Sequence, residues 1–338
     1  MKLEQHQPLL SYNTFQISVT ARLFCTINNL NDLQNIFGDE KYFSTPKLIL
    51  GGGSNILFTK NFDGLVIKNE IQGIEKIGED ESYVFVKAAA GEAWHQFVLF
   101  CIEHNWAGLE NLSLIPGCVG ASPIQNIGAY GVELKDVFHS LEAFSILEKK
   151  MVQFNLSDCE FGYRDCVFKR HFKNQFVITS VTFRLLKNPI FKIGYGAISQ
   201  ELEKMKVGKL SIKAISEAVI NIRSLKLPNP KVLGNAGSFF KNPEIENEKF
   251  VALKNNFPTI AAFDLPNGNK KLAAGWLIEQ CGWKGKTIGR CGVHEYQALV
   301  IVNYGGATGS EIFDLSEQIL QSVKQKFGVV LEREVNIL

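Results

Sequence analysis

Apolar residues recur along this chain at two spacings, which predict where strands and helices lie. In the first third, the segment 48–55 is predicted to be an apolar strand that runs into a glycine loop, and alternating or apolar segments predict strands at 64–69 and 83–90. The segment WHQFVLFCIEHN at 94–105 has the length and spacing of a helix. After a long stretch of little regular pattern, strands are predicted again through SLEAFSILEKKMVQF and FVITSVTFRLL.

A helix is predicted over 211–223, because Ile212, Ile215, Val219 and Ile222 fall on one face. The sequence LPNP that follows would end this helix and is the best candidate for a domain boundary.

The last third of the chain again mixes helices and strands. A helix ending near Phe257 is followed by the apolar segment 272–281 and by the strand LVIV. Thr308 and Glu311 form a capping-box pattern at the start of a final helix. The closing segment 329–338 is predicted to be a strand. Strands come in runs and are not each followed by a helix, so the fold class is α+β or mixed α/β.

Composition indicates a globular protein of two or three domains. The chain has 338 residues, of which 46% are hydrophobic and 21% charged. The net charge of +2, without a long basic run, argues against a nucleic-acid partner. No stretch resembles a signal peptide or a membrane span, so we expect a cytoplasmic protein with no membrane partner. Seven cysteines without a CxxC pair are expected to be free thiols.

Several common motifs are absent. The dinucleotide fingerprint GxGxxG does not occur, and the six histidines are scattered, so no metal site is expected.

Two glycine-rich segments are candidates for a ligand site. GGGSN comprises Gly51, Gly52, Gly53, Ser54 and Asn55; its successive N–H groups could hold a pyrophosphate, although a flexible turn would look the same. PGCVGASPIQNIGAYG at 116–131 cannot be regular throughout, and it could wrap a flat apolar ligand or form an ordered loop with a packing role only.

Three further segments carry candidate chemistry. GYRD presents Arg164, whose planar fork suits a carboxylate or an enolate, or a surface ion pair. NAGSFFKNP presents Ser238 among small residues, where it could donate a proton or hydrogen-bond its own backbone. LEREV places Glu332 and Glu334 on the same side of a strand, where either carboxylate could be buried or solvated.

Together these segments resemble the UDP-N-acetylenolpyruvoylglucosamine reductases (the MurB family) in their type I form. The resemblance covers nearly the whole chain and rests on ordered blocks, namely LENLSLIPGCVGASPIQNIGAYGVEL, CEFGYRD, KLPNPKVLGNAGSFFKNP, KLAAGWLIEQCG, VHEYQALV and the closing Glu-Val. It implies an α+β fold, in which a two-subdomain FAD-binding module of the flavin oxidase (PCMH-like) class precedes a C-terminal α+β substrate domain. The implied ranges are 1–69 for the first FAD subdomain, to which the C-terminal strand could return, 70–227 for the second, and 228–338 for the substrate domain.

The resemblance also implies roles for individual residues. Arg164, Ser238 and Glu334 would be catalytic. The residues that would hold FAD are Gly51, Gly52, Gly53, Ser54, Asn55, Gly120, Ser122, Ile124 and Gly128. The residues that would line the substrate site are Tyr130, Tyr163, Tyr195, Lys226, Asn242 and Gln297, with Tyr195 on the insert that marks type I.

The implied reaction is the reduction of UDP-N-acetylglucosamine enolpyruvate to UDP-N-acetylmuramate, a step in peptidoglycan precursor synthesis. FAD would be bound non-covalently and NADPH would be the co-substrate, in ping-pong order and in a monomer. Ser238 would protonate the carbanion while Arg164 and a protonated Glu334 stabilise charge on the adjacent carboxylate. The alternatives are an FAD-dependent oxidase of the same fold and a non-catalytic nucleotide-sugar or flavin binding protein.

Overall fold

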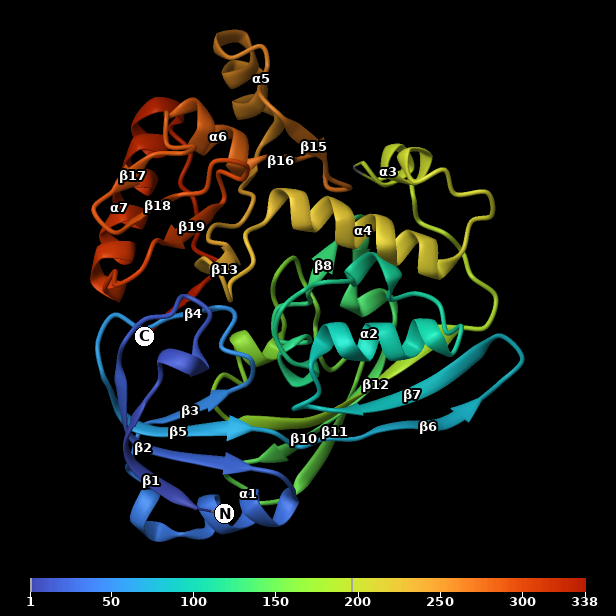
Figure 1. The fold of residues 1–338 in the computed structure, drawn as a ribbon, viewed down its shortest axis with the longest axis vertical. Coiled ribbons are helices and arrows are strands. Elements are labelled where there is room, and N and C mark those ends of the chain that lie inside the picture. The colour runs from blue at the N-terminus through green and yellow to red at the C-terminus, as the bar shows by residue number, and fades with distance from the viewer. Residues whose placement is uncertain (1, 196) are drawn as a thin grey trace. The chain divides into compact units, whose positions relative to one another are not determined.

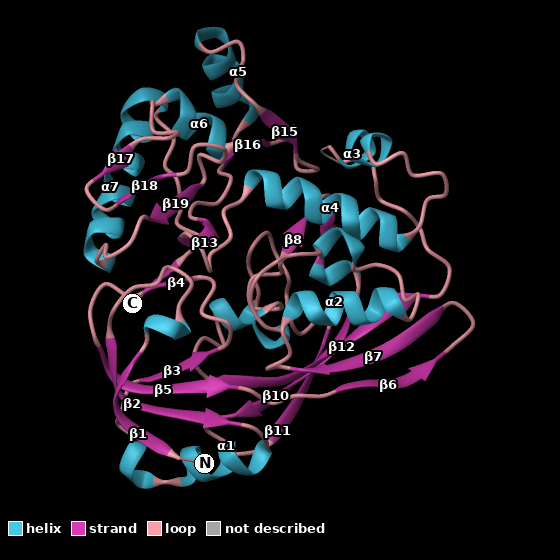
Figure 2. Cartoon of the chain, in the orientation of Figure 1, coloured by secondary structure: helices cyan, strands magenta, loops and turns pink. Residues whose placement is uncertain are grey.

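The computed structural model describes residues 2–195 and 197–338, and it has the α+β architecture that the sequence predicted (Figures 1 and 2). The chain divides into two compact units. Unit 1 comprises Met1–Gln7, Ala21–Gly52 and Asp63–Leu225, and unit 2 comprises Pro8–Thr20, Gly53–Phe62 and Lys226–Leu338. The longest segment of unit 2 therefore begins beside the boundary predicted after residue 227. Unit 2 also takes in two short segments from the range 1–69. The assignment of an FAD module and a substrate domain stays a prediction.

Unit 1 is built on two main sheets. The first has the strand order β1-β2-β5-β3, with β3 parallel to β5, and the second has the antiparallel order β11-β10-β12-β7-β6. The strands of these sheets are β1 (Leu3–Pro8), β2 (Thr20–Ile27), β3 (Lys47–Leu50), β5 (Phe62–Asn69), β6 (Ile74–Glu79), β7 (Tyr83–Ala89), β10 (Phe138–Ser145), β11 (Met151–Asn155) and β12 (Phe176–Leu186). A small hairpin pairs β8 (Gly128–Ala129) with β9 (Val132–Glu133).

The second sheet is covered by α2 (Trp94–Glu103), which lies along one of its faces in Figure 1. Trp94, Phe97 and Cys101 of α2 are buried in one cluster with Val86 of β7 and Phe183 of β12. The apolar period read from 94–105 thus matches the buried face of the helix. A smaller cluster packs α1 (Leu30–Gly38) onto the first sheet.

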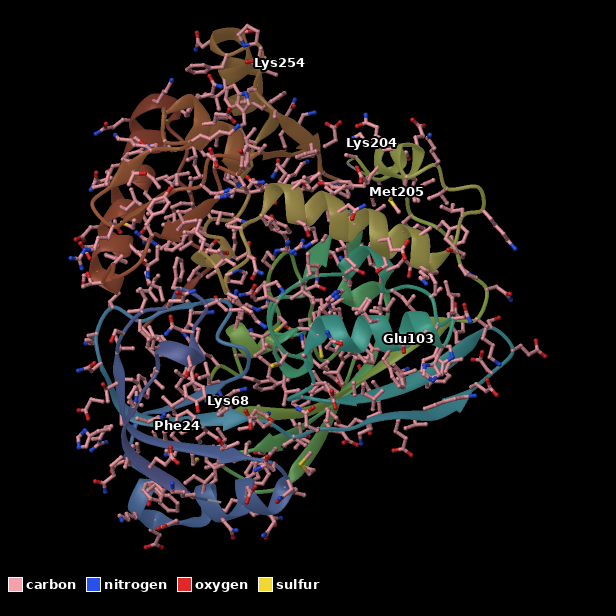
Figure 3. All side chains as sticks on the ribbon, in the orientation of Figure 1. Phe24, Lys68, Glu103, Lys204, Met205 and Lys254 are labelled. Carbon is pink, nitrogen blue, oxygen red and sulfur yellow. The ribbon has the colours of Figure 1, made fainter. Side chains whose placement is uncertain are left out.

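The segment after β12 holds two helices, α3 (Ile198–Lys204) and α4 (Ile212–Lys226). Ile198 and Leu202 pack against Ile215 and Val219, and Met205 packs on the same cluster (Figure 3). Helix α4 continues three residues beyond the predicted end and stops at Lys226. Pro228 explains this stop, because a proline disfavours the helical conformation of the residue before it.

Unit 2 contains two antiparallel sheets, with the orders β13-β19-β18-β17 and β14-β16-β15. Their strands are β13 (Gly234–Ser238), β14 (Glu244–Ile245), β15 (Ala262–Asp264), β16 (Lys270–Leu272), β17 (Thr287–Ile288), β18 (Cys291–Val293) and β19 (Val300–Asn303). Its helices are α5 (Asn247–Asn256), α6 (Ala274–Gln280) and α7 (Gly309–Phe327). Thr308 caps α7, and the predicted capping box with Glu311 is formed in full.

The strand predicted over 329–338 is mostly wrong. Only Asn336–Ile337 forms a strand, β20, which pairs in parallel with β4 (Ile56–Leu57). Earlier in the segment a single bridge joins Arg333 to Phe240. The alternation of VVLEREV has a strand's period, but within the described residues no neighbouring strand pairs with it over enough residues to form a ladder.

Three global properties follow from the described residues. All seven cysteines are free thiols, and only Cys281 is not fully buried. No helix within 2–195 or 197–338 is long and apolar enough to cross a membrane. Over the same ranges, no cluster of histidine, cysteine, aspartate or glutamate could hold a metal ion.

Candidate active site

The residues predicted to form the site fall in both units. The first group is the pair of glycine-rich segments. In unit 1, a Cβ on Gly52 would lie 2.8 Å from the Cα of Gly117, so the two segments are in backbone contact. Likewise, a Cβ on Gly120 would lie 2.4 Å from that of Ala90. Both glycines are therefore required for close packing.

The loop at 51–55 also presents backbone N–H groups that could donate to an anion. In unit 2, Gly53 has φ of 61°, and a Cβ there would lie 2.0 Å from the carbonyl oxygen of Tyr12. Among the described residues, the amides of Gly52 and Gly53 donate no hydrogen bond. Consecutive unpaired N–H groups in a glycine loop suit a phosphate oxygen, so the loop fits the pyrophosphate of FAD.

The other predicted cofactor residues follow along the second segment. Ser122 is buried and its hydroxyl donates to the carbonyl of Val119 at 2.6 Å. Ile124 is half-buried, and its carbonyl accepts from the thiol of Cys166 at 3.2 Å. Gly128 begins the β8–β9 hairpin. The role of each toward FAD stays a prediction.

The β8–β9 hairpin presents Tyr130. Its two-residue loop is Tyr130–Gly131, with φ of 50° and 78°, as in the primed turns that close tight hairpins. The side chain of Asn111 donates to the carbonyl of Tyr130 at 2.8 Å and fixes the loop. A Cβ on Gly131 would lie 3.2 Å from the Cβ of Tyr195, so the turn of the hairpin lies against the segment that carries Tyr195. The structure thus brings Tyr130 and Tyr195 together.

Arg164 lies in a second tight turn. The N–H of Gly162 donates to the carbonyl of Asp165 at 2.9 Å, and Arg164 itself has φ of 55°. A positive φ is unfavourable for arginine, and such strained residues concentrate at functional sites. The guanidinium donates from Nη2 to the carbonyl of Gly128 at 2.7 Å and lies 5.5 Å from the centroid of the Tyr163 ring.

Asn126 joins this turn to the hairpin. It is fully buried, and its Nδ2 donates to the carbonyl of Gly162 at 2.9 Å and to Glu133 Oε2 at 3.0 Å. Its Oδ1 accepts from the N–H of Lys135 at 3.0 Å. One side chain therefore sets the distance between the Arg164 turn and the strands that flank Tyr130.

Sequence reasoning noted Asn126 in the glycine-rich stretch but gave it no role. It also missed Arg223 of α4, whose Nε is buried and has no hydrogen-bond partner among the described residues. A signal for Arg223 was present. It lies four residues after Val219 and eight after Ile215, so the helical period places it on the apolar stripe of α4.

In unit 2, Ser238 and Glu334 lie on neighbouring segments. Ser238 ends β13, and Phe239, the next residue, accepts a hydrogen bond of 2.8 Å from the N–H of Glu334. The side chain of Asn55 donates to the carbonyl of Glu334 at 3.1 Å. Three predicted site residues are thus brought together through the backbone.

The hydroxyl of Ser238 makes no hydrogen bond that the structure records among the described residues, so the alternative of a serine bonded to its own backbone is not supported. The preceding Gly237 has φ of 69°, in a bulge of the β13–β19 ladder. Bulges of this kind commonly re-aim a side chain. Glu334 is half-buried, whereas Glu332 is exposed and pairs with Lys241.

Asn242 and Gln297 lie at the beginning of α6. Asn242 Oδ1 accepts from the N–H of Ala274 at 2.9 Å, and Gln297 Oε1 lies 3.3 Å from the position a Cβ would take on Gly275. Lys226 is exposed at the last residue of α4.

Comparison with known proteins gives two matches to family models. The FAD binding domain matches residues 21–147. The C-terminal domain of UDP-N-acetylenolpyruvoylglucosamine reductase matches residues 229–338.

The likeness to solved structures concerns the fold. The crystal structure of UDP-N-acetylenolpyruvylglucosamine reductase from Thermus caldophilus has a TM-score of 0.70 at 22% identity, covering 100% of this chain and 99% of that one. A solvent-stable cholesterol oxidase has a TM-score of 0.51 at 11% identity, covering 98% and 86%. The fold and the FAD-domain match define an FAD-binding protein of the class that these two structures represent.

Curated relatives narrow that class. They include the UDP-N-acetylenolpyruvoylglucosamine reductases of Amoebophilus asiaticus, 53% identical over 338 residues and 100% of both chains, and of Flavobacterium johnsoniae, 46% identical over 339 residues and 100% of both. That of Burkholderia lata is 46% identical over 99% of this chain and 96% of the relative. The chain belongs to the UDP-N-acetylenolpyruvoylglucosamine reductase family.

Proposed function

We propose that this chain reduces UDP-N-acetylglucosamine enolpyruvate to UDP-N-acetylmuramate, with FAD as its cofactor and NADPH as the electron donor. The observation that carries the proposal is the 53% identity to a reductase of that name along the whole of both chains. We propose further that the enzyme works as a monomer in the cytoplasm, in peptidoglycan precursor synthesis.

The glycine loop supports the choice of cofactor. The unpaired amides of Gly52 and Gly53, with Ser54 and Asn55, would hold the FAD pyrophosphate. Gly120, Ser122, Ile124 and Gly128 of the second segment would hold the flavin. When bound, FAD would accept hydride from NADPH and pass it to the terminal enolpyruvyl carbon, so that the two nucleotides use one site in turn.

Arg164 would hold the carboxylate of the enolpyruvyl group. Its guanidinium is oriented by the carbonyl of Gly128, at 2.7 Å, and by that of Asn126, at 3.5 Å. A fork fixed in advance costs less to order when the substrate binds. It would also stabilise the negative charge that develops beside the carboxylate during reduction.

Ser238 would donate the proton to the carbanion. Serine is a weak acid, so it needs a strongly basic acceptor and a fixed position. Gly237 and the bulge of the ladder supply that position. Glu334, whose backbone is bonded to the carbonyl of Phe239 and to the side chain of Asn55, would stabilise the same charge as a hydrogen-bond donor when protonated.

The remaining predicted residues would bind the UDP-sugar. Tyr130 and Tyr163 would contact it together with Tyr195, which lies against the Gly131 turn. Lys226, Asn242 and Gln297 would contribute a cation and two amides.

The test is an assay of the purified holoenzyme. NADPH absorbance is followed with and without UDP-N-acetylglucosamine enolpyruvate. A yellow protein whose NADPH consumption depends on that compound is the expected result. If the protein is yellow but consumes NADPH only together with oxygen, its function is that of an FAD-dependent oxidase and not of the proposed reductase. A protein that binds FAD but never oxidises NADPH would be a binding protein.

The Ser238→Ala variant separates the two half-reactions. We expect NADPH to reduce its flavin at the wild-type rate, because no proton donor to the sugar is used in that step. Reoxidation by the enolpyruvyl compound should slow by roughly 10²- to 10⁴-fold. Reoxidation at the wild-type rate would remove the serine from the mechanism.

A further inference from the structure

The first turn of α2 holds the chain where it enters the second glycine-rich segment. The backbone N–H of Trp94 donates to the carbonyl of Gly117 at 3.0 Å, and its indole Nε1 donates to the carbonyl of Leu112 at 2.9 Å. In the next residue, Nδ1 of His95 accepts from the N–H of Leu114 at 3.0 Å. Two neighbouring residues of one helix therefore fix the entering chain at three points.

The conformation held at Leu114 is one that leucine does not favour. Leu114 has φ of 58°, in the left-handed region, where a Cβ is crowded by the backbone. Such a conformation persists only where the surrounding contacts determine it. Among the described residues, the ring of His95 is the one acceptor for the N–H of Leu114. The imidazole therefore supplies a contact that this turn requires.

The turn lies close to the loop proposed for the FAD pyrophosphate. Three residues after Leu114, Gly117 has φ of 114°, and its Cα would lie 2.8 Å from a Cβ on Gly52. The amide of Gly52 is one of the two unpaired N–H groups of that loop. Farther along the same segment come Gly120 and Ser122, which the proposed function assigns to the flavin. A shift at Leu114 would therefore move backbone on which the whole cofactor site depends.

His95 can accept this hydrogen bond only as a neutral ring. A backbone N–H is always a donor, so Nδ1 must present its lone pair and the ring proton must lie on Nε2. Protonation would place a second N–H opposite that of Leu114 and break the contact. Burial and the positive charge of Arg223 on α4 both lower the pKa of His95, and so favour the neutral ring.

Two further ionisable groups belong to the elements packed against this end of α2. Glu110 begins η3 (Glu110–Leu112), which packs against the helix, and Cys118 forms a bridge with Ala93, the N-cap residue of α2. The strands beneath α2 face it with apolar side chains. Burial raises the pKa of Glu110 and of Cys118 and so favours their uncharged forms. A comparison that changes His95 alone separates its titration from that of Glu110.

We infer that His95 is a positioning residue of the FAD site, and that the chain binds FAD more tightly when His95 is neutral than when it is protonated. The inference rests on the FAD site of the proposed function. By linkage, bound FAD keeps the ring neutral, and a proton taken up by His95 weakens FAD binding. Below the pKa that His95 has in the FAD-free chain, the dissociation constant of FAD should rise by up to tenfold per pH unit.

The experiment measures the dissociation constant of FAD between neutral and mildly acidic pH. Holoenzyme is diluted in series, and the released FAD is measured after ultrafiltration. His95→Asn does not titrate but keeps an acceptor, because Oδ1 of asparagine is as many bonds from the backbone as Nδ1 of histidine. His95→Leu has no acceptor. His104→Asn is the matched control, because His104 is an exposed histidine at the other end of α2.

We expect wild type and His104→Asn to lose FAD affinity as the pH falls, whereas His95→Asn should keep its neutral-pH dissociation constant throughout. His95→Leu should bind FAD roughly tenfold more weakly at every pH, because the N–H of Leu114 loses its acceptor. A packing role would not give this pattern, since leucine fills the position as well as asparagine does. The same pH dependence in wild type and His95→Asn would overturn the inference, as would normal FAD binding by His95→Leu at neutral pH.

Nitrogen NMR of histidine-labelled holoenzyme covers the case in which His95→Leu does not fold. The signals of His95 are those missing from His95→Asn. At neutral pH its Nδ1 should be the unprotonated ring nitrogen, and bound FAD should keep it so to a lower pH than in the FAD-free chain. A proton on Nδ1 at neutral pH, or a pKa of His95 that FAD does not lower, contradicts the inference.

Failure of this inference differs from failure of the proposed function. A chain that binds no FAD at any pH removes both. A chain that binds FAD with the expected pH dependence, but does not oxidise NADPH with the enolpyruvyl compound, removes the reductase and keeps the role of His95. An active reductase whose FAD affinity is the same function of pH in wild type and His95→Asn removes only the role of His95.

Discussion

At the scale of single residues, the site in unit 1 is held largely by side chains that bond to the backbone. Arg164 contacts the carbonyls of Gly128 and Asn126, and Asn111 contacts the carbonyl of Tyr130. Each side chain adopts one geometry because its partner is part of a tight turn. Positioning therefore depends on a few buried amides as much as on the residues proposed to do chemistry.

Asn126 is the amide with the largest expected effect. Asn126→Ala leaves the N–H of Lys135 without its acceptor and removes one of the two donors to the carbonyl of Gly162, so unfolding should require about 2 kcal/mol less free energy. The Arg164 turn should also shift, which lowers kcat for the sugar. Urea unfolding and steady-state kinetics measure the two effects. Gln125→Ala, a change at the half-buried neighbour, is the control, and equal effects at both positions would contradict the role of Asn126.

At the scale of elements, α7 illustrates how far local sequence determines local structure. The Thr308 hydroxyl accepts from the N–H of Glu311 at 3.2 Å, and Glu311 Oε2 accepts from the N–H of Thr308 at 2.7 Å. The helix ends at Gly328, which has φ of 64°, a conformation that glycine adopts at little cost. Both ends are fixed by residues within one turn.

Thr308→Ala should therefore cost about 1 kcal/mol of stability, because the N–H of Glu311 and the carboxylate of Glu311 both lose their bond to the Thr308 hydroxyl. Chemical denaturation measures the change. Thr308→Ser keeps the hydroxyl and should recover most of the stability. If the alanine and serine variants unfold alike, the capping box does not stabilise this helix.

The same distinction between local and long-range causes explains what the sequence could predict. β12 at Phe176–Leu186 and the buried face of α2 follow from period and composition, and both were predicted. The structure of the last ten residues was not predicted correctly. Their pairing depends on Phe239, Phe240 and β4, which lie far away in the sequence. The contact of Asn126 with the Arg164 turn and the unpaired Nε of Arg223 also depend on distant segments.

At the scale of the whole molecule, stability should depend on pH through His95. Its Nδ1 accepts from the N–H of Leu114 at 3.0 Å, and burial and Arg223 lower its pKa. The folded state therefore holds His95 neutral, while the unfolded state takes up a proton below about pH 6.5. Stability should be complete above that pH and should be lost as the pH falls toward the folded-state pKa, by up to about 1.4 kcal/mol per pH unit.

The check is urea unfolding of wild type and His95→Asn between neutral and mildly acidic pH. Asparagine keeps an acceptor for Leu114 but does not titrate, so the difference between the curves should shrink as the pH falls. Burial raises the pKa of Glu110, which opposes the trend in both proteins and cancels in the comparison. Parallel curves would show that His95 is not responsible.

Cofactor linkage is a second property of the whole molecule. FAD that binds only the folded chain should stabilise it by about 2.7 kcal/mol at 100 times its dissociation constant. Thermal unfolding of stripped protein, titrated with FAD, measures this effect, and FMN, which lacks the pyrophosphate and adenosine, is the control. Equal stabilisation by both nucleotides would contradict the role proposed for Gly52 and Gly53.

The pairing of β20 with β4 has a consequence for how a ribosome makes this protein. Asn55 and Glu334, which are hydrogen-bonded in unit 2, lie 279 positions apart. At ordinary rates of synthesis, roughly 15 to 55 s pass between the emergence of the one and of the other. During that interval the buried side chains of Phe15, Leu57 and Phe58 have no completed core to enter. Nascent chains of this protein therefore expose these side chains to chaperones, and to aggregation, until the final residues leave the exit tunnel.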